Sequence, residues 1–255
     1  MNSTTSTNKK GTIKLWSIIF WLFIWQGLSL YIEQEILLAS PLSVLNRLVY
    51  LAITYDFWVS ILFSLSRITA GFFLATFVGI IFATLASRFR FIEHLLVPLI
   101  LFVNATPVAS IIILLLIWFS SQPLSIIISF LMVLPIIYTN VLSGIKNTDA
   151  KLLEMAEVFE MPMSKRILYI YIPQIFPFFK AACLVGLGIS WKSGIAAEVI
   201  GIPRGSIGAN LHQARIFLAT SDLFAWTLTI IMISTLFERI FMFLLKQAMN
   251  KLERL

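Results

Sequence analysis

The chain is 255 residues long, with 59% hydrophobic and 12% charged residues and a formal net charge of +7. Water-soluble domains carry about 25% charged residues, so this composition excludes one. The chain is therefore predicted to be a polytopic membrane protein.

Apolar segments long enough to cross a bilayer occur six times along the chain. A helix needs about 20 apolar residues, at about 1.5 Å rise per residue, to span a hydrocarbon core of about 30 Å. Irregular backbone leaves polar groups without partners in lipid, so an all-α bundle of six transmembrane helices is predicted. The segments run approximately over residues 13–32, 58–86, 95–119, 124–145, 174–200 and 223–245.

Positive charge is distributed unevenly between the loops. The side that includes both chain ends and the 147–177 loop holds most of the loop lysines and arginines, and the 33–57 and 201–222 segments hold few. Lysine and arginine gather on the cytoplasmic side of membrane proteins, which predicts cytoplasmic termini and a cytoplasmic 147–177 loop. This distribution accounts for the basic net charge, so no nucleic-acid partner is predicted.

Residues 1–12 form a polar N-terminal tail, and the apolar segment behind it has the position of a secretory signal. That segment is longer than the usual signal core of about 7–15 residues, and no small-x-small cleavage site directly follows it. A retained span is therefore expected instead of a cleaved signal. Residues 13–255 are predicted to form a single transmembrane domain.

Local signals before residue 90 predict one extra helix and one packing surface. Ser40 followed by Pro41 is typical of a helix start, and the apolar spacing predicts a short interfacial helix up to Asp56. Gly71 and Gly79, with alanine midway between them, form a small-residue series that permits close helix contact. Packing within one chain is expected there, with a dimer seam as the alternative.

The third apolar segment contains Pro98, Asn104 and Pro107. Proline removes a backbone donor and clashes with the preceding turn, so this helix is predicted to bend or break near mid-membrane. Asn104 is a candidate for the translocation pathway, and the alternative is that it caps the broken helix.

The fifth and sixth apolar segments carry charges, which are expensive inside a membrane and normally face water or the bundle interior. Trp191, Lys192 and Glu198 are therefore candidates for the translocation pathway. For Glu198, near the outer end, snorkelling, helix packing or a counter-charge role are the alternatives. Glu238 and Arg239 are expected to form a solvated pair near the cytoplasmic boundary.

The loop at 147–173 has the pattern of two short helices. Asp149 can cap the first, on which Ala156 and Phe159 belong to an apolar stripe, and a second helical piece is predicted to begin near Met163. Short amphipathic helices of this kind suit insertion into a groove on another protein. The loop is therefore predicted to be a contact surface.

Signals of enzymatic chemistry are missing from the sequence. No GxxxxGK[ST] phosphate loop, nucleophile with a base, or paired-carboxylate site occurs. His94 and His212 have no second ligand at metal-binding spacing, so no metal site is predicted. The chain is expected to be non-catalytic and to bind no cofactor itself.

The 147–173 loop resembles the EAA loop of permease subunits in binding-protein-dependent ABC importers, where a Glu-Ala-Ala triplet is followed by glycine and later by Leu-Pro. Glu154, Met155 and Ala156 occupy the triplet, and Pro173 ends the later dipeptide. Two departures are visible: Met155 replaces the first alanine, and Glu160 stands where the glycine is expected.

Glycine at that position would permit a left-handed turn that costs glutamate about 1 kcal/mol. The turn is therefore expected to move to Met161–Pro162 or to differ in shape. The resemblance implies an ATPase-coupling surface made of Glu154, Met155, Ala156, Glu157, Phe159, Glu160, Met161, Pro162 and Pro173.

Further matches follow in order along the chain and resemble the nitrate, sulfonate, taurine and bicarbonate branch of these permeases. They are Leu38–Pro41, Ser66–Arg67 with Ala70–Phe72, Thr106–Pro107 with Leu116–Phe119, and Gly188, Trp191, Ala196–Glu198 and Gly201.

The resemblance implies a MetI-like type I importer fold in the bacterial inner membrane, with two identical permeases around one pathway. It also implies a cytoplasmic ABC ATPase dimer that holds ATP and Mg, and an extracytoplasmic solute-binding protein. The expected solute is a small anion such as a sulfonate or nitrate, or a vitamin precursor.

Two other classes of function remain as alternatives. An ion-coupled secondary transporter or channel would use Lys192 and Glu198 for coupling and predicts inverted repeats, of which the sequence shows no convincing example. A membrane scaffold without transport predicts no ATPase partner.

Overall fold

The computed structural model describes residues 15–252, and the predicted tail over residues 1–12 lies outside them. Within this part of the chain the regular structure is helical, as the predicted all-α class requires. The elements are α1 (Leu15–Ile32), α2 (Pro41–Ile53), α3 (Tyr55–Arg88), α4 (Arg90–Ala105), α5 (Val108–Trp118), α6 (Leu124–Lys146), α7 (Ala150–Val158), α8 (Met163–Arg166), the π-helical turn η1 (Ile167–Tyr171), α9 (Ile172–Gly201), α10 (Ile207–Ile216) and α11 (Thr220–Leu252).

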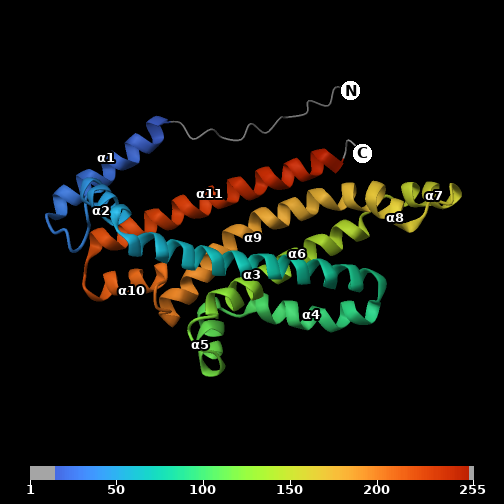
Figure 1. The fold of residues 1–255 in the computed structure, drawn as a ribbon, viewed down its shortest axis with the longest axis horizontal. Helices are drawn as coiled ribbons and strands as arrows, with labels where there is room; N and C mark the ends of the chain where they lie inside the picture. Colours follow the sequence, from blue (N-terminus) through green and yellow to red (C-terminus); the bar gives the residue numbers. More distant parts are fainter. Residues whose placement is uncertain (1–14, 253–255) are drawn as a thin grey trace.

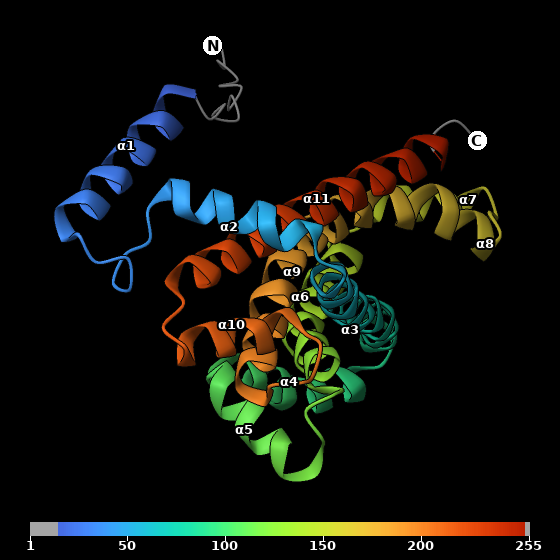
Figure 2. The same ribbon diagram turned by 60° about the vertical axis from the view of Figure 1, so that its left-hand side comes forward.

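The long helices α3, α6, α9 and α11 extend along the length of the molecule in the view of Figure 1, and Figure 2 shows α3 nearly end-on while α11 lies across the view. Glycines let α6 approach its neighbours closely. A Cβ on Gly71 would lie 2.5 Å from the carbonyl oxygen of Ile126, and a Cβ on Gly79 would lie 2.9 Å from Ile137. The small-residue series on α3 therefore packs within one chain, as predicted.

Length and composition allow four described helices to cross a membrane. These are α3, α6, α11 and the continuous helix Met163–Gly201, which joins α8, η1 and α9; the pair α4 and α5 makes a fifth span if taken as one. Helix α1 has 18 residues, about 27 Å of helix, which is shorter than a hydrocarbon core of about 30 Å. The first predicted span, over residues 13–32, therefore remains a prediction from sequence.

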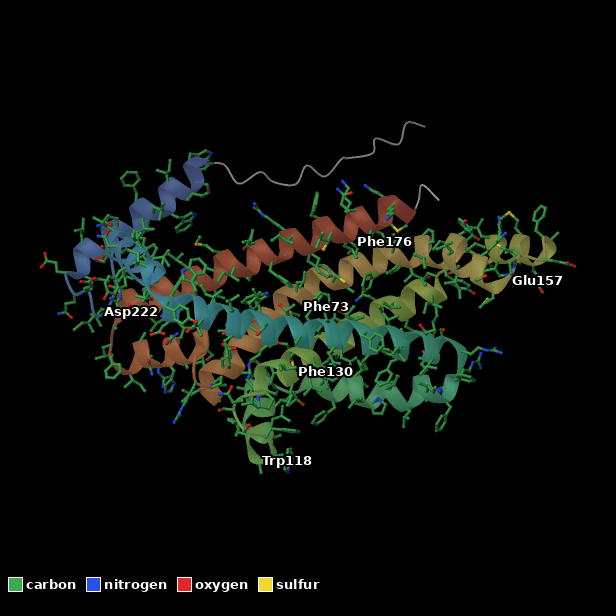
Figure 3. All side chains as sticks on the ribbon, in the orientation of Figure 1. Phe73, Trp118, Phe130, Glu157, Phe176 and Asp222 are labelled. Atoms are coloured by element: carbon green, nitrogen blue, oxygen red, sulfur yellow. The ribbon has the colours of Figure 1, made fainter. Side chains whose placement is uncertain are left out.

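The predicted break in the third apolar segment is confirmed. Helices α4 and α5 differ in direction by 107°, with Pro107 at the break. Thr106 is the C-cap of α4 because Pro107 disfavours helical geometry in the residue before it, and the Thr106 hydroxyl and backbone N–H both donate to the Phe102 carbonyl. Helix α5 points away from the long helices, with Trp118 at its tip (Figures 1 and 3).

The short helix predicted after the first apolar segment is α2. The Ser40 hydroxyl accepts a hydrogen bond from the Ser43 backbone N–H at 3.1 Å, and Pro41 occupies the first turn, as predicted. The helix ends at Ile53, and Asp56 lies in the first turn of α3 instead.

Candidate functional site

Helices α7 and α8 form the tip of the molecule opposite α10 (Figure 1), and Figure 3 shows Glu157 at its extremity. The Asp149 carboxylate accepts a hydrogen bond from the Lys151 backbone N–H at 2.9 Å, which caps α7. A second helix begins at Met163. The predicted start of each helix is therefore confirmed, but the second is not a short helix, because it continues without a break as the helix Met163–Gly201.

Glu160 itself makes the turn between these helices, with φ of 50°. The Met161 N–H donates to the Ala156 carbonyl at 2.8 Å, and the Glu160 N–H donates to the Glu157 carbonyl at 2.9 Å. This is a Schellman ending, which usually places glycine in the left-handed position, and Pro162 follows it. The expected shift of the turn to Met161–Pro162 was wrong, because two backbone hydrogen bonds hold Glu160 in the glycine conformation.

Arg166 fastens the same turn. Its Nε donates to the Met161 carbonyl at 2.7 Å and its Nη2 donates to the Ala156 carbonyl at 3.3 Å. Because a guanidinium is planar and carries five donors, one side chain can bind both carbonyls. The geometry of the turn therefore depends on a residue outside the predicted coupling set.

The outer face of α7 combines apolar and acidic side chains. Val158 is 80% exposed and Phe159 75% exposed, whereas Ala156 is fully buried beneath them. We call this exposed face the α7 surface; it consists of Glu154, Met155, Glu157, Val158, Phe159 and Glu160. Large exposed apolar side chains with a polar rim mark a protein contact site.

A buried polar network lies at the other end of the molecule and centres on Glu198, which is 0% exposed. The Ser64 hydroxyl donates to Glu198 Oε2 at 2.6 Å, and the Gly208 N–H donates to the same oxygen at 3.2 Å. Ser64 also accepts from the Ile207 N–H at 3.0 Å. Since these N–H groups begin α10, the carboxylate joins α9, α3 and the positive end of α10.

A cavity of about 340 Å³ lies between α9 and α11. It contains Lys192, which is exposed, and Glu238, which is half-buried. Trp191 also lines it, and its indole N–H has no hydrogen-bond partner among the described residues. The lining consists of Leu187, Gly188, Trp191, Lys192, Ile195, Ile230, Ile231, Ser234 and Glu238.

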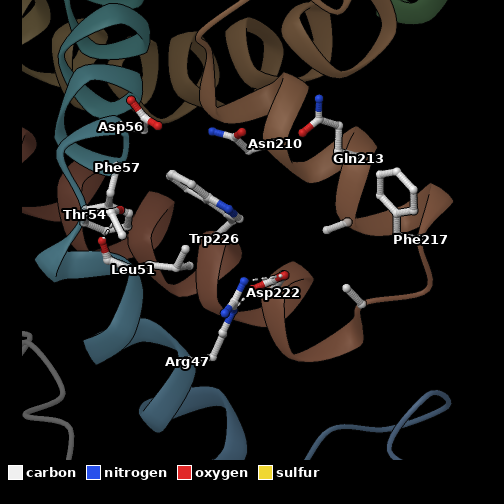
Figure 4. Close-up of a pocket in the computed structure, with 12 residues that line it drawn as sticks. Arg47, Leu51, Thr54, Asp56, Phe57, Asn210, Gln213, Phe217, Asp222 and Trp226 are labelled. Atoms are coloured by element: carbon white, nitrogen blue, oxygen red, sulfur yellow. Dashed lines mark hydrogen bonds and ion pairs between the residues drawn. The ribbon is translucent and has the colours of Figure 1, made fainter.

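A second cavity, of about 330 Å³, lies where α2, α3, α10 and α11 meet (Figure 4). Arg47 and Asp222 form a two-point ion pair on one side of Trp226, and Asn210 lies on the other side. This hydrogen bonding to Asp222 raises the pKa of Arg47 above its ordinary value. The ion pair links α2 to the start of α11, so the Arg47 guanidinium stabilises the packing of these two helices.

The structure brings some predicted pathway residues together and separates others. Trp191 and Lys192 share the α9–α11 cavity, whereas Glu198 is buried in its own network. That burial excludes the snorkelling considered for Glu198. Asn104 is exposed in the last turn of α4, and its side chain has no hydrogen bond to any described residue; the capping considered for it belongs to Thr106.

Comparison with known proteins identifies the family. A family model described as the inner membrane component of binding-protein-dependent transport systems matches residues 75–251, which is more than half of the chain. The chain belongs to this family. It is therefore a permease, the transmembrane component of a binding-protein-dependent importer.

Curated relatives are permeases of ABC importers. The chain is 27% identical over 205 residues to the putative aliphatic sulfonates permease SsuC of Bacillus subtilis, covering 79% of this chain and 74% of the relative. It is 24% identical over 238 residues to the taurine permease TauC of Escherichia coli, covering 91% and 86%. The bicarbonate permease CmpB of Synechococcus elongatus is 29% identical over 145 residues, 56% of this chain and 52% of CmpB. The alternative of an ion-coupled secondary transporter or channel receives no support from them.

Sequence reasoning missed two residues that shape this permease. Arg166 follows the end of α7, where unpaired carbonyls attract basic side chains, and this was the available signal. Glu238 was expected to pair with Arg239 near the cytoplasmic boundary, but the ion pairs among the described residues do not include these two, and Glu238 lines the α9–α11 cavity with Lys192. Its position depends on how α11 packs against α9, which no local pattern reveals.

Proposed function

We propose that this permease forms the translocation pathway of an ATP-driven importer and binds a cytoplasmic ABC ATPase dimer through the α7 surface. The observation that carries the proposal is the exposure of Val158 and Phe159, at the end of a short helix outside the long apolar spans. Exposed apolar side chains on a short helix suit a groove on a partner. ATP and Mg belong to that partner, and this chain contributes the contact.

The charge of the loops supports an orientation for the assembly. Lysines and arginines concentrate at the α7 end of the chain, which by the positive-inside rule faces the cytoplasm together with both termini. The α10 end then faces outward, where an extracytoplasmic solute-binding protein delivers the solute. The membrane is the bacterial inner membrane in this proposal.

A rigid connection between the α7 surface and the pathway gives the coupling a physical basis. The Schellman turn and Arg166 fix α7 to α8, and Met163–Gly201 is one continuous helix of 39 residues. A displacement of α7 by the ATPase therefore moves the helix that carries Lys192.

The α9–α11 cavity is the proposed part of the pathway, with Trp191 and Lys192 lining it. Lys192 favours an acidic solute, and the sulfonate, taurine and bicarbonate named for the relatives each carry an acidic group. Glu198 acts as a positioning residue beside the pathway, and Asn104 lies at the helix break. A vitamin precursor is the second candidate solute. A second identical permease completes the pathway and covers part of the exposed α11.

The test replaces Phe159 with glutamate, which adds a charge to the centre of the α7 surface. The Phe159→Glu permease is expected to lose co-purification with the ATPase and at least tenfold of ATP-driven uptake in proteoliposomes, because a buried interface charge costs several kcal/mol. Phe217→Glu is the matched control for ATPase co-purification, since Phe217 is 78% exposed at the opposite end. If the Phe159→Glu permease still bound the ATPase fully, the assignment of the α7 surface as the ATPase contact would be refuted. The assignment would also be refuted if Phe217→Glu lost ATPase binding and Phe159→Glu did not.

A further inference from the structure

The α9–α11 cavity is lined by one positive and one negative side chain, each on a helix that is long and apolar enough to span a membrane. Lys192 and Glu238 lie within long apolar helices, where ions are costly and normally pair or face water. Among the described residues the ion pairs are Arg47–Asp222 and Lys146–Glu93, so Lys192 and Glu238 do not pair with each other or with another described group. Two opposite charges therefore face one cavity without neutralising each other.

Their order along the cavity follows from the helix directions. Helices α9 and α11 run antiparallel, so Glu238 lies towards the α7 end and Ile230 towards the α10 end. Gly188 and Lys192 lie one helical turn apart on α9, about 6 Å along the axis. The positive group is thus displaced towards the α10 end of the cavity relative to the negative one.

The cavity has open space beside Gly188. A Cβ on Gly188 would meet no atom within 4 Å, whereas a Cβ on Gly194, on the same helix, would lie 2.7 Å from Ile68. Glycine within a helix costs about 0.5–1 kcal/mol relative to alanine, so packing explains Gly194 but not Gly188. The space beside Gly188 is available to a solute.

We propose that the α9–α11 cavity binds a short zwitterionic solute, with its acidic group at Lys192 and its ammonium group at Glu238. This inference rests on the proposed pathway and narrows its substrate class. A simple anion would be attracted by the Lys192 ammonium but repelled by the Glu238 carboxylate. A neutral solute would remove water from both charged groups without giving either an oppositely charged partner. A molecule with both groups satisfies both side chains, and a volume of about 340 Å³ suits a small ligand.

The experiment compares solutes that differ only by the ammonium group. The permease with its co-purified ATPase is placed in nanodiscs, and weak binding is followed by saturation-transfer NMR. The probes are taurine against ethanesulfonate and β-alanine against propionate. The zwitterion of each pair is expected to bind about tenfold more tightly, because a charge-assisted contact adds to the one at Lys192.

Variants assign the effect to the two side chains. Glu238→Gln is expected to abolish the preference within each pair, and Lys192→Met to weaken binding of all four probes. Arg239→Gln is the matched control, since Arg239 is adjacent in sequence, exposed and absent from the cavity lining. Gly188→Val is expected to block all probes by filling the open space.

Equal binding within both pairs, a preference that survives in Glu238→Gln, or absence of binding by every probe would each overturn the zwitterion site. The same nanodiscs are assayed for ATP hydrolysis stimulated by the solute-loaded binding protein. Loss of that stimulation contradicts the importer coupling, whereas its presence without a zwitterion preference contradicts only this inference.

Discussion

The two ends of this permease use glutamate in opposite ways. At the α7 end, Glu157 is exposed on a short helix whose turn is held by backbone groups and Arg166. At the α10 end, Glu198 is fully buried and its hydrogen bonds join α9, α3 and α10. The Glu157 carboxylate is therefore accessible to a partner protein, whereas the Glu198 carboxylate stabilises the packing of the helices. Their residue type alone does not distinguish the two roles, but burial does.

The largest difference between the two ends is expected when the Glu198 and Glu157 carboxylates are each removed. Glu198→Ala is expected to destabilise the permease by about 3 kcal/mol, because it leaves a cavity and removes the acceptor for Ser64 and the Gly208 N–H. Glu157→Ala is expected to change the unfolding free energy by less than about 0.5 kcal/mol, since Glu157 is exposed. Thermal unfolding in detergent measures both.

Glu198→Gln separates hydrogen bonding from charge in this test. Glutamine retains one carbonyl oxygen for the same two donors, so about half of the loss is expected to be recovered. A stability of Glu198→Ala equal to that of Glu157→Ala would contradict the anchoring role of the buried network.

The next largest effect is expected at the contact between α9 and α10. A Cβ on Gly208 would lie 2.3 Å from Glu198 Cβ and 2.6 Å from backbone atoms of α9. Gly208→Ala should therefore cost about 2 kcal/mol in stability, because backbone must move. Gly188→Ala has no atom to displace and is expected to be neutral or slightly stabilising in the same thermal assay. Equal unfolding temperatures for the two variants would show that α10 is free to shift.

Local sequence rules predicted most of the secondary structure here. Ser40 with Pro41 marked the start of α2, Asp149 marked the start of α7, and Pro107 marked the break between α4 and α5. These features succeed because each depends on neighbouring residues: a cap oxygen reaches an N–H within three positions, and proline acts on its own turn.

The arrangement of charges was less predictable because it depends on tertiary packing. Lys192 was recognised as unusual, yet its cavity neighbour Glu238 lies on another helix and was assigned to the membrane boundary. Glu198 was considered as a snorkelling residue, although Ser64 and α10 bury it. Sequence identifies an expensive charge in a span, and only the packing of helices shows what surrounds it.

Arg166 gives an intermediate effect at the α7 end. Arg166→Met is expected to weaken the turn by about 1.5 kcal/mol, because the Ala156 and Met161 carbonyls lose a charged donor. Hydrogen exchange of the amides over residues 156–161 should become roughly tenfold faster. Arg166→Lys is the matched variant and should recover only part of the protection, since an ammonium lacks the planar fork. Unchanged exchange in Arg166→Met would mean that the backbone bonds alone hold the turn.

Glu160→Gly has the smallest expected effect on stability, and it is expected to stabilise the turn that Arg166→Met weakens. Glu160 adopts φ of 50°, a conformation that costs a non-glycine residue about 1 kcal/mol. Glycine should therefore slow amide exchange over residues 156–161 several-fold without changing the hydrogen-bond pattern, because the Schellman bonds use only backbone groups. Because Glu160 also belongs to the α7 surface, ATPase co-purification is measured on the same variant. A more protected turn combined with weaker ATPase binding would show that the Glu160 carboxylate itself contacts the partner, which would explain why a strained glutamate occupies this position.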